Sequence, residues 1–201
     1  EIRLSLVGSE MCIRDSGCTA TIGNTENMHP ANTITVCYNG SVGETFYQDK
    51  PFLASDDVNV LYPKFDMTKE MALFIVPLIK LASARYSYID KWKREDMIAD
   101  TIKLPANASG EPDWQFMEDY IKEIQKKVQN KIFKQKGNKK KIDIATAENK
   151  TEKKWEKYRI GDLFKILLSK DDIQPKLVNE GSFPLVSVSY THLTLPTICS
   201  V

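Results

Sequence analysis

The stretch DWQFMEDYIKEIQKKVQNKIFKQK, residues 113–136, is the longest uninterrupted helical pattern in the sequence. Apolar residues recur along it at steps of four and three, at Met117, Ile121, Ile124, Val128 and Ile132. Lys, Glu and Gln fill most other positions, and at about 1.5 Å per residue the helix would be roughly 36 Å long. A narrow apolar stripe on a long polar helix favours a second helix lying along it, as in a coiled coil. The alternative is an ordinary amphipathic helix packed on its own domain.

The composition is that of a globular protein rather than a disordered one. The chain has 201 residues, of which 42% are hydrophobic and 27% charged, and its formal net charge is +1. This charge gives no global argument for nucleic-acid binding, so a basic binding surface would have to come from local clustering. The apolar run 71–81 is too short to span a membrane, and four scattered cysteines form no disulfide framework. We therefore expect a cytoplasmic protein.

Short strands precede the long helix. Residues 17–32 are polar and turn-rich, which predicts a loop. Four segments then have the branched and aromatic composition of strands: 33–38, 44–47, 51–55 and 58–63. Asn39-Gly40 between the first two is a strong tight-turn signal. These segments predict a compact β unit.

Helical periodicity begins at Thr68, which with Asp66 is a candidate N-cap, and continues to about Ser83. Pro77 inside it should kink or divide the helix, because proline lacks the N–H that a helix interior needs. A short helix through Ala99, a strand at 101–105 and a linker at 106–112 follow. Together with the β unit and the long helix, these elements predict an α+β fold.

These features together resemble the specificity (S) subunit of type I restriction–modification systems. The matching text is NGSVGETFYQDKPFLASDDVNVLYP (39–63), YSYIDKW (86–92), IKLP (102–105) and DWQFMEDYI (113–121). In that family a target recognition domain is followed by a long spacer helix and then by a second recognition domain. The second domain opens with a W-x-x-Y-x-I-G-D-L-F-like segment, which is similar to residues 155–164 here. One departure is Ile89-Asp90, where many relatives carry Gly followed by Arg or Lys.

The resemblance divides the chain into pieces. We expect the C-terminal part of a first recognition domain at 17–112, a spacer helix at 113–136, a lysine-rich linker at 137–154 and the start of a second recognition domain at 155–187. Residues 1–16 and 188–201 resemble translated sequencing-adapter (transposon-end) DNA, because one short inverted repeat can encode both MCIRD (11–15) and VSYTH (188–192). On this hypothesis both ends are artefacts of sequencing and the chain is a fragment.

The resemblance implies DNA recognition without catalysis. The chain would direct partner methyltransferase and nuclease subunits to a bipartite site. S-adenosylmethionine, ATP and Mg²⁺ would be bound by those partners, with no cofactor or metal in this chain. The sequence agrees, since it contains no methyltransferase segment, no phosphate-binding glycine loop and no nucleophile–base pair. A nuclease-like set of Asp113, Glu123 and Lys126 has the wrong structural context, and Cys18, His29 and Cys37 fit loops and strands better than a zinc site.

Cations interleaved with aromatic residues make 85–94 the best candidate for DNA contact. The candidates in this segment are Arg85, Tyr86, Tyr88, Lys91, Trp92, Lys93 and Arg94. The alternative is that its aromatic residues are core anchors and its lysines are solvated. Asn39 is a further candidate, because an asparagine amide can pair with adenine, although a turn asparagine more often serves backbone geometry.

Two other functions stay open at this point. The chain could be the recognition part of a fused methyltransferase–nuclease enzyme, in which case a methyltransferase motif would lie upstream in the same reading frame. It could also be a coiled-coil interaction protein with no role in DNA binding, which would show no sequence-selective binding.

Overall fold

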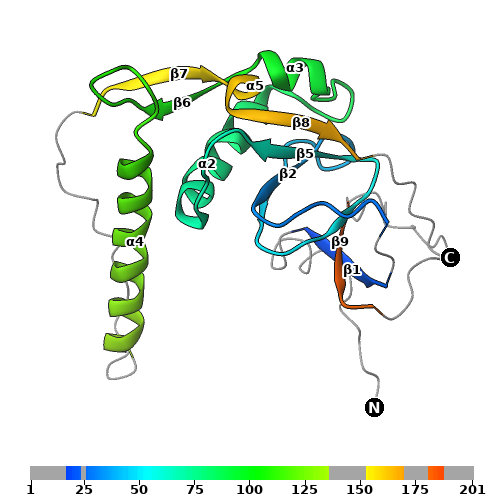
Figure 1. Ribbon diagram of the computed structural model, residues 1–201, viewed down its shortest axis with the longest axis horizontal. Coiled ribbons are helices and arrows are strands. Elements are labelled where there is room, and N and C mark those ends of the chain that lie inside the picture. The colour runs from blue at the N-terminus through cyan, green and yellow to red at the C-terminus, as the bar shows by residue number, and fades with distance from the viewer. Residues whose placement is uncertain (1–16, 24–25, 136–152, 170–180, 188–201) are drawn as a thin grey trace, which may run out of the picture.

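The computed structural model describes residues 17–23, 26–135, 153–169 and 181–187, and Figure 1 shows the arrangement of their elements. The expected adapter-like ends and nearly all of the lysine-rich linker lie outside these residues. The strands are β1 Cys18–Ile22, β2 Thr33–Cys37, β3 Thr45–Gln48, β4 Leu53–Ala54, β5 Val58–Pro63, β6 Thr101–Pro105, β7 Trp155–Arg159, β8 Phe164–Leu168 and β9 Phe183–Val186. The helices are α2 Lys69–Ala82, η1 Ser83–Arg85, α3 Arg94–Ala99, α4 Trp114–Gln135 and α5 Ile160–Leu163. An α+β fold is therefore confirmed.

Three small sheets organise the described chain. The largest has the order β3-β2-β5-β8, the second β1-β9-β4, and the third is the antiparallel pair β6-β7. The alternation of side chains along β2 and β5 divides their apolar residues between two faces. Ile34, Val36 and Leu61 face the main core, whereas Val58 and Val60 face a smaller cluster with Phe52 and Val186.

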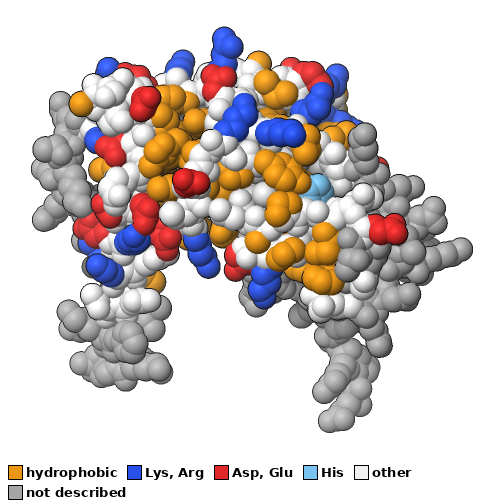
Figure 2. Space-filling model, in the orientation of Figure 1, with side chains coloured by type: hydrophobic (Ala, Val, Ile, Leu, Met, Phe, Trp, Pro, Cys, Tyr) orange, Lys and Arg blue, Asp and Glu red, His pale blue; other side chains and the backbone are white. Residues whose placement is uncertain are grey.

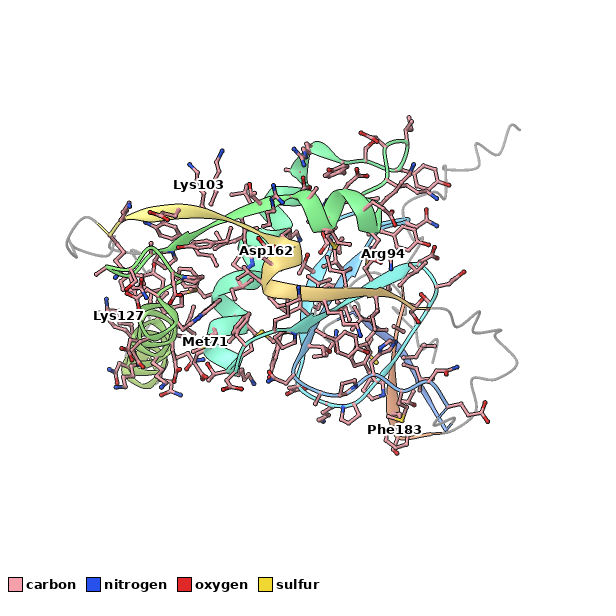
Figure 3. All side chains as sticks on the ribbon, turned by 45° about the horizontal axis from the view of Figure 1, so that its top comes forward. Met71, Arg94, Lys103, Lys127, Asp162 and Phe183 are labelled. Atoms are coloured by element: carbon pink, nitrogen blue, oxygen red, sulfur yellow. The ribbon has the colours of Figure 1, made fainter. Side chains whose placement is uncertain are left out.

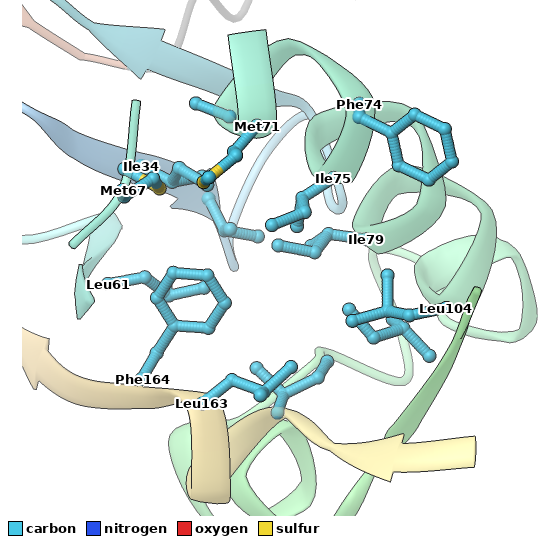
Figure 4. Packing of buried hydrophobic residues seen from close by; sticks show 14 of the residues in the cluster. Ile34, Leu61, Met67, Met71, Phe74, Ile75, Ile79, Leu104, Leu163 and Phe164 are labelled. Atoms are coloured by element: carbon cyan, nitrogen blue, oxygen red, sulfur yellow. The ribbon is translucent and has the colours of Figure 1, made fainter. Parts of the chain in front are cut away.

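Helix α2 covers the main core side of the large sheet (Figure 4). Ile75 and Ile79 of this helix are fully buried, and the Thr68 side chain caps its start by accepting a hydrogen bond from the Met71 backbone N–H at 3.3 Å. Pro77 lies inside one continuous helix of 14 residues, so the expectation that it could divide the helix is wrong. The tertiary contacts of the helix's buried face outweigh the lost hydrogen bond.

Helix α4 stands at one end of the molecule, away from β1 and β9 (Figure 1). It has 22 residues, and its first half packs on α2 and the segment before α2. The Trp114 ring stacks on Phe65 with centroids 4.0 Å apart, and Tyr120 meets the Phe74 ring edge-on at 5.7 Å. The expected long helix is confirmed, and its N-terminal half is anchored by ring packing.

Residues 17–32 were expected to form a loop, and this is wrong in part. β1 occupies Cys18–Ile22 and pairs antiparallel with β9, which lies more than 160 residues later in the sequence. The polar, turn-rich sequence after β1 predicted a loop, although Thr19, Thr21 and Ile22 are β-branched residues typical of strands. A strand whose partner among the described strands is so distant has no local hairpin signal.

The described residues 155–169 and 181–187 are built into the same fold as the described residues before α4. β7 pairs with β6, β8 pairs with β5, and β9 lies between β1 and β4. Ile160, Leu163 and Phe164 are buried in the main core, so this segment completes it. Its expected role as the start of a second recognition domain in a longer protein stays a prediction.

Candidate nucleic-acid interface

The segment 85–94 links η1 to α3, and its residues divide into an anchored and an exposed set. Trp92 is fully buried, while 61% of Tyr88 and 96% of Ile89 are exposed to solvent. The turn that presents Tyr88 and Ile89 is closed by two hydrogen bonds between Ser87 and Asp90. The Ser87 N–H donates to the Asp90 carbonyl at 2.9 Å, and the Asp90 N–H donates to Ser87 Oγ at 3.2 Å.

The anchored set meets at one carboxylate, Asp100. Trp92 Nε1 donates to its Oδ2 at 2.7 Å, and the Tyr86 hydroxyl donates to the same oxygen at 3.0 Å. The Arg85 guanidinium forms an ion pair with Oδ1. Asp100 is 9% exposed, and the Tyr86 and Trp92 rings stack with centroids 5.5 Å apart. We call Arg85, Tyr86, Trp92 and Asp100 the Asp100 cluster.

The Asp100 cluster bears on three candidates. Tyr86 and Trp92 donate to Asp100, which is the core-anchor alternative for the two rings. Arg85 pairs with Asp100 but keeps 63% of its side chain exposed, so DNA contact by Arg85 stays a prediction. Asp100 was missed by the sequence reading. A carboxylate flanked by α3 and β6 was the available signal, because a buried acid needs donors close by.

The exposed set keeps its solvent access. Lys93 and Arg94 are exposed, and the Arg94 guanidinium lies 3.4 Å from the Glu95 carboxylate. Lys91 is half-buried, with its ammonium 5.9 Å from the centre of the Tyr88 ring. The structure therefore brings Tyr88, Lys91, Lys93 and Arg94 together on one short, rigidly based segment.

Asn39 has a structural partner. Its Nδ2 donates to the Asp57 carboxylate at 2.6 Å, and the positive φ of 66° in this turn belongs to Gly40 rather than to Asn39. Burial, followed by the negative charges of Asp57 and Asp56, raises the pKa of the neighbouring Tyr38. Asn39 thus forms a hydrogen bond to Asp57 across the turn. Because Asn39 has no positive φ, the turn does not need asparagine at this position for its backbone angle.

The residues weighed for metal chemistry have other partners. Cys37 lies in the smaller apolar cluster, and His29 Nδ1 lies 2.6 Å from the Tyr62 hydroxyl. Asp113 caps α4 by accepting from the Phe116 N–H at 3.0 Å, and Glu123 forms an ion pair with Lys127 at 3.0 Å. Among the described residues, no three His, Cys, Asp or Glu side chains gather as a metal site, and no helix there is long and apolar enough to cross a membrane.

The apolar stripe of α4 changes character along its length. Met117 is fully buried and Ile121 packs against the main core, whereas Ile124 and Val128 are 39% and 50% exposed. The Ile132 side chain lies outside the described side chains. The helix therefore presents an uncovered apolar stripe in its second half within the described structure.

Residues 20–134, from β1 almost to the end of α4, match the family described as the type I restriction modification DNA specificity domain. The chain belongs to this family. The match contains the Asp100 cluster, the exposed set and nearly all of α4, so all the candidate DNA-binding residues lie within the specificity domain.

A curated relative of the specificity domain is named "Type II restriction enzyme BgcI specificity subunit S.BcgI", from Heyndrickxia coagulans. It is 35% identical over 115 residues, which are 57% of this chain and 34% of the relative. The aligned part thus spans about a third of the relative's length. No solved structure matches the chain.

Proposed function

We propose that this chain recognises a specific DNA sequence as part of a restriction–modification specificity subunit. In this role it directs partner methyltransferase and nuclease subunits to a bipartite site on double-stranded DNA. The observation that carries the proposal is the specificity-domain match over residues 20–134, supported by a relative that is itself named a specificity subunit. The cytoplasm, where DNA and these partners meet, is the expected location.

The exposed set of Tyr88, Lys91, Lys93 and Arg94 is the proposed DNA contact of the 85–94 segment. Lysine and arginine can neutralise phosphates, and an exposed tyrosine ring can pack against sugar or base. The Asp100 cluster acts as a positioning element, because it fixes both sides of the segment that presents these side chains. Phosphate contacts of this kind set register on the duplex, whereas base contacts set the sequence read.

Helix α4 is the proposed spacer between two half-site readers. The apolar stripe of α4 supports the spacer role. Its first residues belong to or pack against the main core, whereas Ile124 and Val128 are exposed and could pack against a second helix. The spacer's length would then set the distance between the half-sites. Val128→Asp should weaken assembly through the helix while leaving the β sheets folded, and Ile124→Pro should do so more severely. Unchanged association with the partner helix would argue against the spacer role.

Catalysis belongs to the partners in this proposal. Methyl transfer would use S-adenosylmethionine on the modification subunit, and cleavage would use ATP and Mg²⁺ on the restriction subunit. The fused methyltransferase–nuclease is a second candidate, whereas the relative's name, which describes a separate specificity subunit, supports the first. Sequencing upstream of residue 17 distinguishes the two, because only a fusion carries a methyltransferase motif in the same frame.

The test of the proposed function is a gel-shift assay with the full-length protein and its modification subunit on genomic DNA fragments. We expect a few fragments to be retained in excess of unlabelled competitor, and they should share one split motif. Retention of all fragments equally, or of none, would contradict sequence recognition and favour the coiled-coil interaction protein.

A further inference from the structure

The two-stranded ribbon of β6 and β7 has one face in the core and one face in solvent. Thr101 pairs with Arg159, Ile102 with Tyr158 and Lys103 with Lys157 in antiparallel register. Ile102 is 2% exposed and Leu104 fully buried, and the Tyr158 hydroxyl donates to the Gly110 carbonyl at 2.8 Å. Because paired residues share a face, the alternate pairs must point outward.

The outward positions are Thr101, Lys103, Lys157 and Arg159, and all four are exposed. We call them the ribbon face. Three of the four are cations and none is a carboxylate. Figure 3 shows the Lys103 side chain pointing away from the core. Figure 2 shows Lys and Arg side chains, with Asp and Glu side chains among them, along the upper edge of the molecule, where β6 and β7 run in Figure 1.

The ribbon face places like charges directly opposite each other. Lys103 and Lys157 are cross-strand partners, an arrangement that destabilises a sheet. Among the described residues, neither lysine nor Arg159 has an ion-pair partner, in contrast to Lys80 with Glu44, Lys153 with Asp113 or Arg85 with Asp100. The repulsion between the two lysines thus destabilises the ribbon, and an external anion bound between them would reduce this repulsion.

The other end of the ribbon is fixed. Pro105 is buried, and the Trp155 ring stacks on Phe74 with centroids 6.1 Å apart. At the charged end the Ile160 N–H donates to the Asp100 carbonyl at 2.8 Å, which joins β7 to the Asp100 cluster. The cations are therefore carried by a short, well-anchored ribbon rather than by a mobile loop.

We propose that the ribbon face binds the phosphate backbone of double-stranded DNA. This inference rests on the proposed function and adds a second contact surface to the 85–94 segment. A two-stranded ribbon fits the width of the DNA major groove, and cations on its outer face can reach the phosphates at the groove edges. Thr101 adds a hydroxyl donor at the end of the same face, next to Arg85 and Asp100.

The first test measures DNA affinity against salt concentration for the full-length protein in complex with its modification subunit. Lys103→Gln/Lys157→Gln is compared with Lys50→Gln/Lys126→Gln, which removes the same charge from two exposed lysines on β3–β4 and α4. We expect the ribbon variant to lower the slope of log K against log salt by about two and to weaken binding on related and unrelated sequences alike. The control should keep the wild-type slope.

A second variant separates contact loss from misfolding. Lys157→Glu places opposite charges across the ribbon, so its Tm should equal or exceed that of the wild type. Its DNA affinity should nevertheless fall below that of the double glutamine variant, because a carboxylate repels phosphate.

The outcomes distinguish the inference from the proposed function. Selective binding by the wild type together with wild-type slopes in both ribbon variants would overturn the inference alone. Normal DNA binding with loss of the modification subunit would instead assign the ribbon face to an acidic protein surface, and would also overturn it. Failure of the wild type to bind DNA selectively would overturn both.

Discussion

Two regions of this molecule gather cations, and the environments of these cations are opposite. In the 85–94 segment, Arg85 faces the Asp100 carboxylate, which also accepts from Tyr86 and Trp92. In the ribbon face, Lys103 faces Lys157 and no carboxylate. The difference teaches that local composition alone does not identify a binding surface. A cation with an internal acceptor stabilises the fold, whereas a cation opposite another cation is better explained by an external anion.

The largest effect should come from removing the acceptor of the first region. Asp100→Ala leaves the buried Trp92 Nε1 without its acceptor and breaks the bonds from Tyr86 and Arg85. We expect the free energy of unfolding to fall by roughly 2–4 kcal/mol. Chemical denaturation measures it, with Asp162→Ala at an exposed position as the control, for which we expect about 0.5 kcal/mol or less. Equal stabilities of the two variants would show that the cluster is not structural.

The junction of the two regions gives the next effect. Gly161 follows β7, and a Cβ there would lie 2.7 Å from Ile98 Cγ2 and 2.8 Å from the Ile98 carbonyl oxygen on α3. Gly161→Ala should therefore cost about 1–3 kcal/mol, because the backbone contact cannot move aside cheaply. Adding Ile98→Ala should recover part of the loss by removing Cγ2 while the carbonyl contact remains. Wild-type stability of the single variant, measured by thermal melting, would mean that α5 and α3 are not in close contact.

Lys153, near the start of α4, is another cation that is paired with a carboxylate of the protein. Lys153 donates to Asp113, and this bond, helped by the Phe116 N–H, lowers the pKa of the Asp113 carboxyl. Because folding lowers this pKa, the stabilisation is present above about pH 4 and is lost as the pH falls through the lowered value. Asp113→Ala should cost about 1 kcal/mol at neutral pH through loss of the cap.

The pH dependence of this loss of stability separates the ion pair from the helix cap. Chemical denaturation should show a smaller difference in unfolding free energy between wild type and Asp113→Ala below pH 4 than at neutral pH. Asp113→Asn serves as the control, since it keeps a capping side chain but carries no charge. A difference that is constant with pH would assign the effect to the cap alone.

The smallest effect on stability should come from the exposed set. Lys91→Gln/Lys93→Gln removes two cations that contact no carboxylate in the Asp100 cluster, so we expect unfolding free energies within about 0.5 kcal/mol of wild type. In DNA binding the same variant should lower the salt slope by about one to two. A change in unfolding free energy without a change in the salt dependence of DNA binding would mean that these lysines stabilise the fold and do not contact DNA.

Local patterns in the sequence predicted the elements that depend on local signals. The stripe from Met117 to Val128, the Thr68 cap and the branched strand 33–38 reproduce α4, α2 and β2 within two residues. Elements that depend on distant partners were harder to predict. β1 was predicted to be loop because its neighbour among the described strands is the distant β9. The pairing of β7 with β6 and of β8 with β5 likewise leaves no local trace in the sequence.

The candidate site was predicted to a similar extent. The sequence located the 85–94 segment but could not assign its side chains, because the acceptor Asp100 is decisive and lies eight residues beyond Trp92. The ribbon face was missed entirely. Lys103 and Lys157 are each unremarkable in their own segments, and only the antiparallel register places them together.

Profiling of DNA methylation in the source genome tests the central claim most directly. A strain carrying the intact gene should show one split motif methylated throughout the genome, and deletion of the gene should abolish methylation at that motif alone. Restoring the gene with Lys103→Gln/Lys157→Gln should give partial methylation at the same motif, since phosphate contacts set affinity rather than sequence. An unchanged methylation pattern after deletion would contradict a role in DNA recognition.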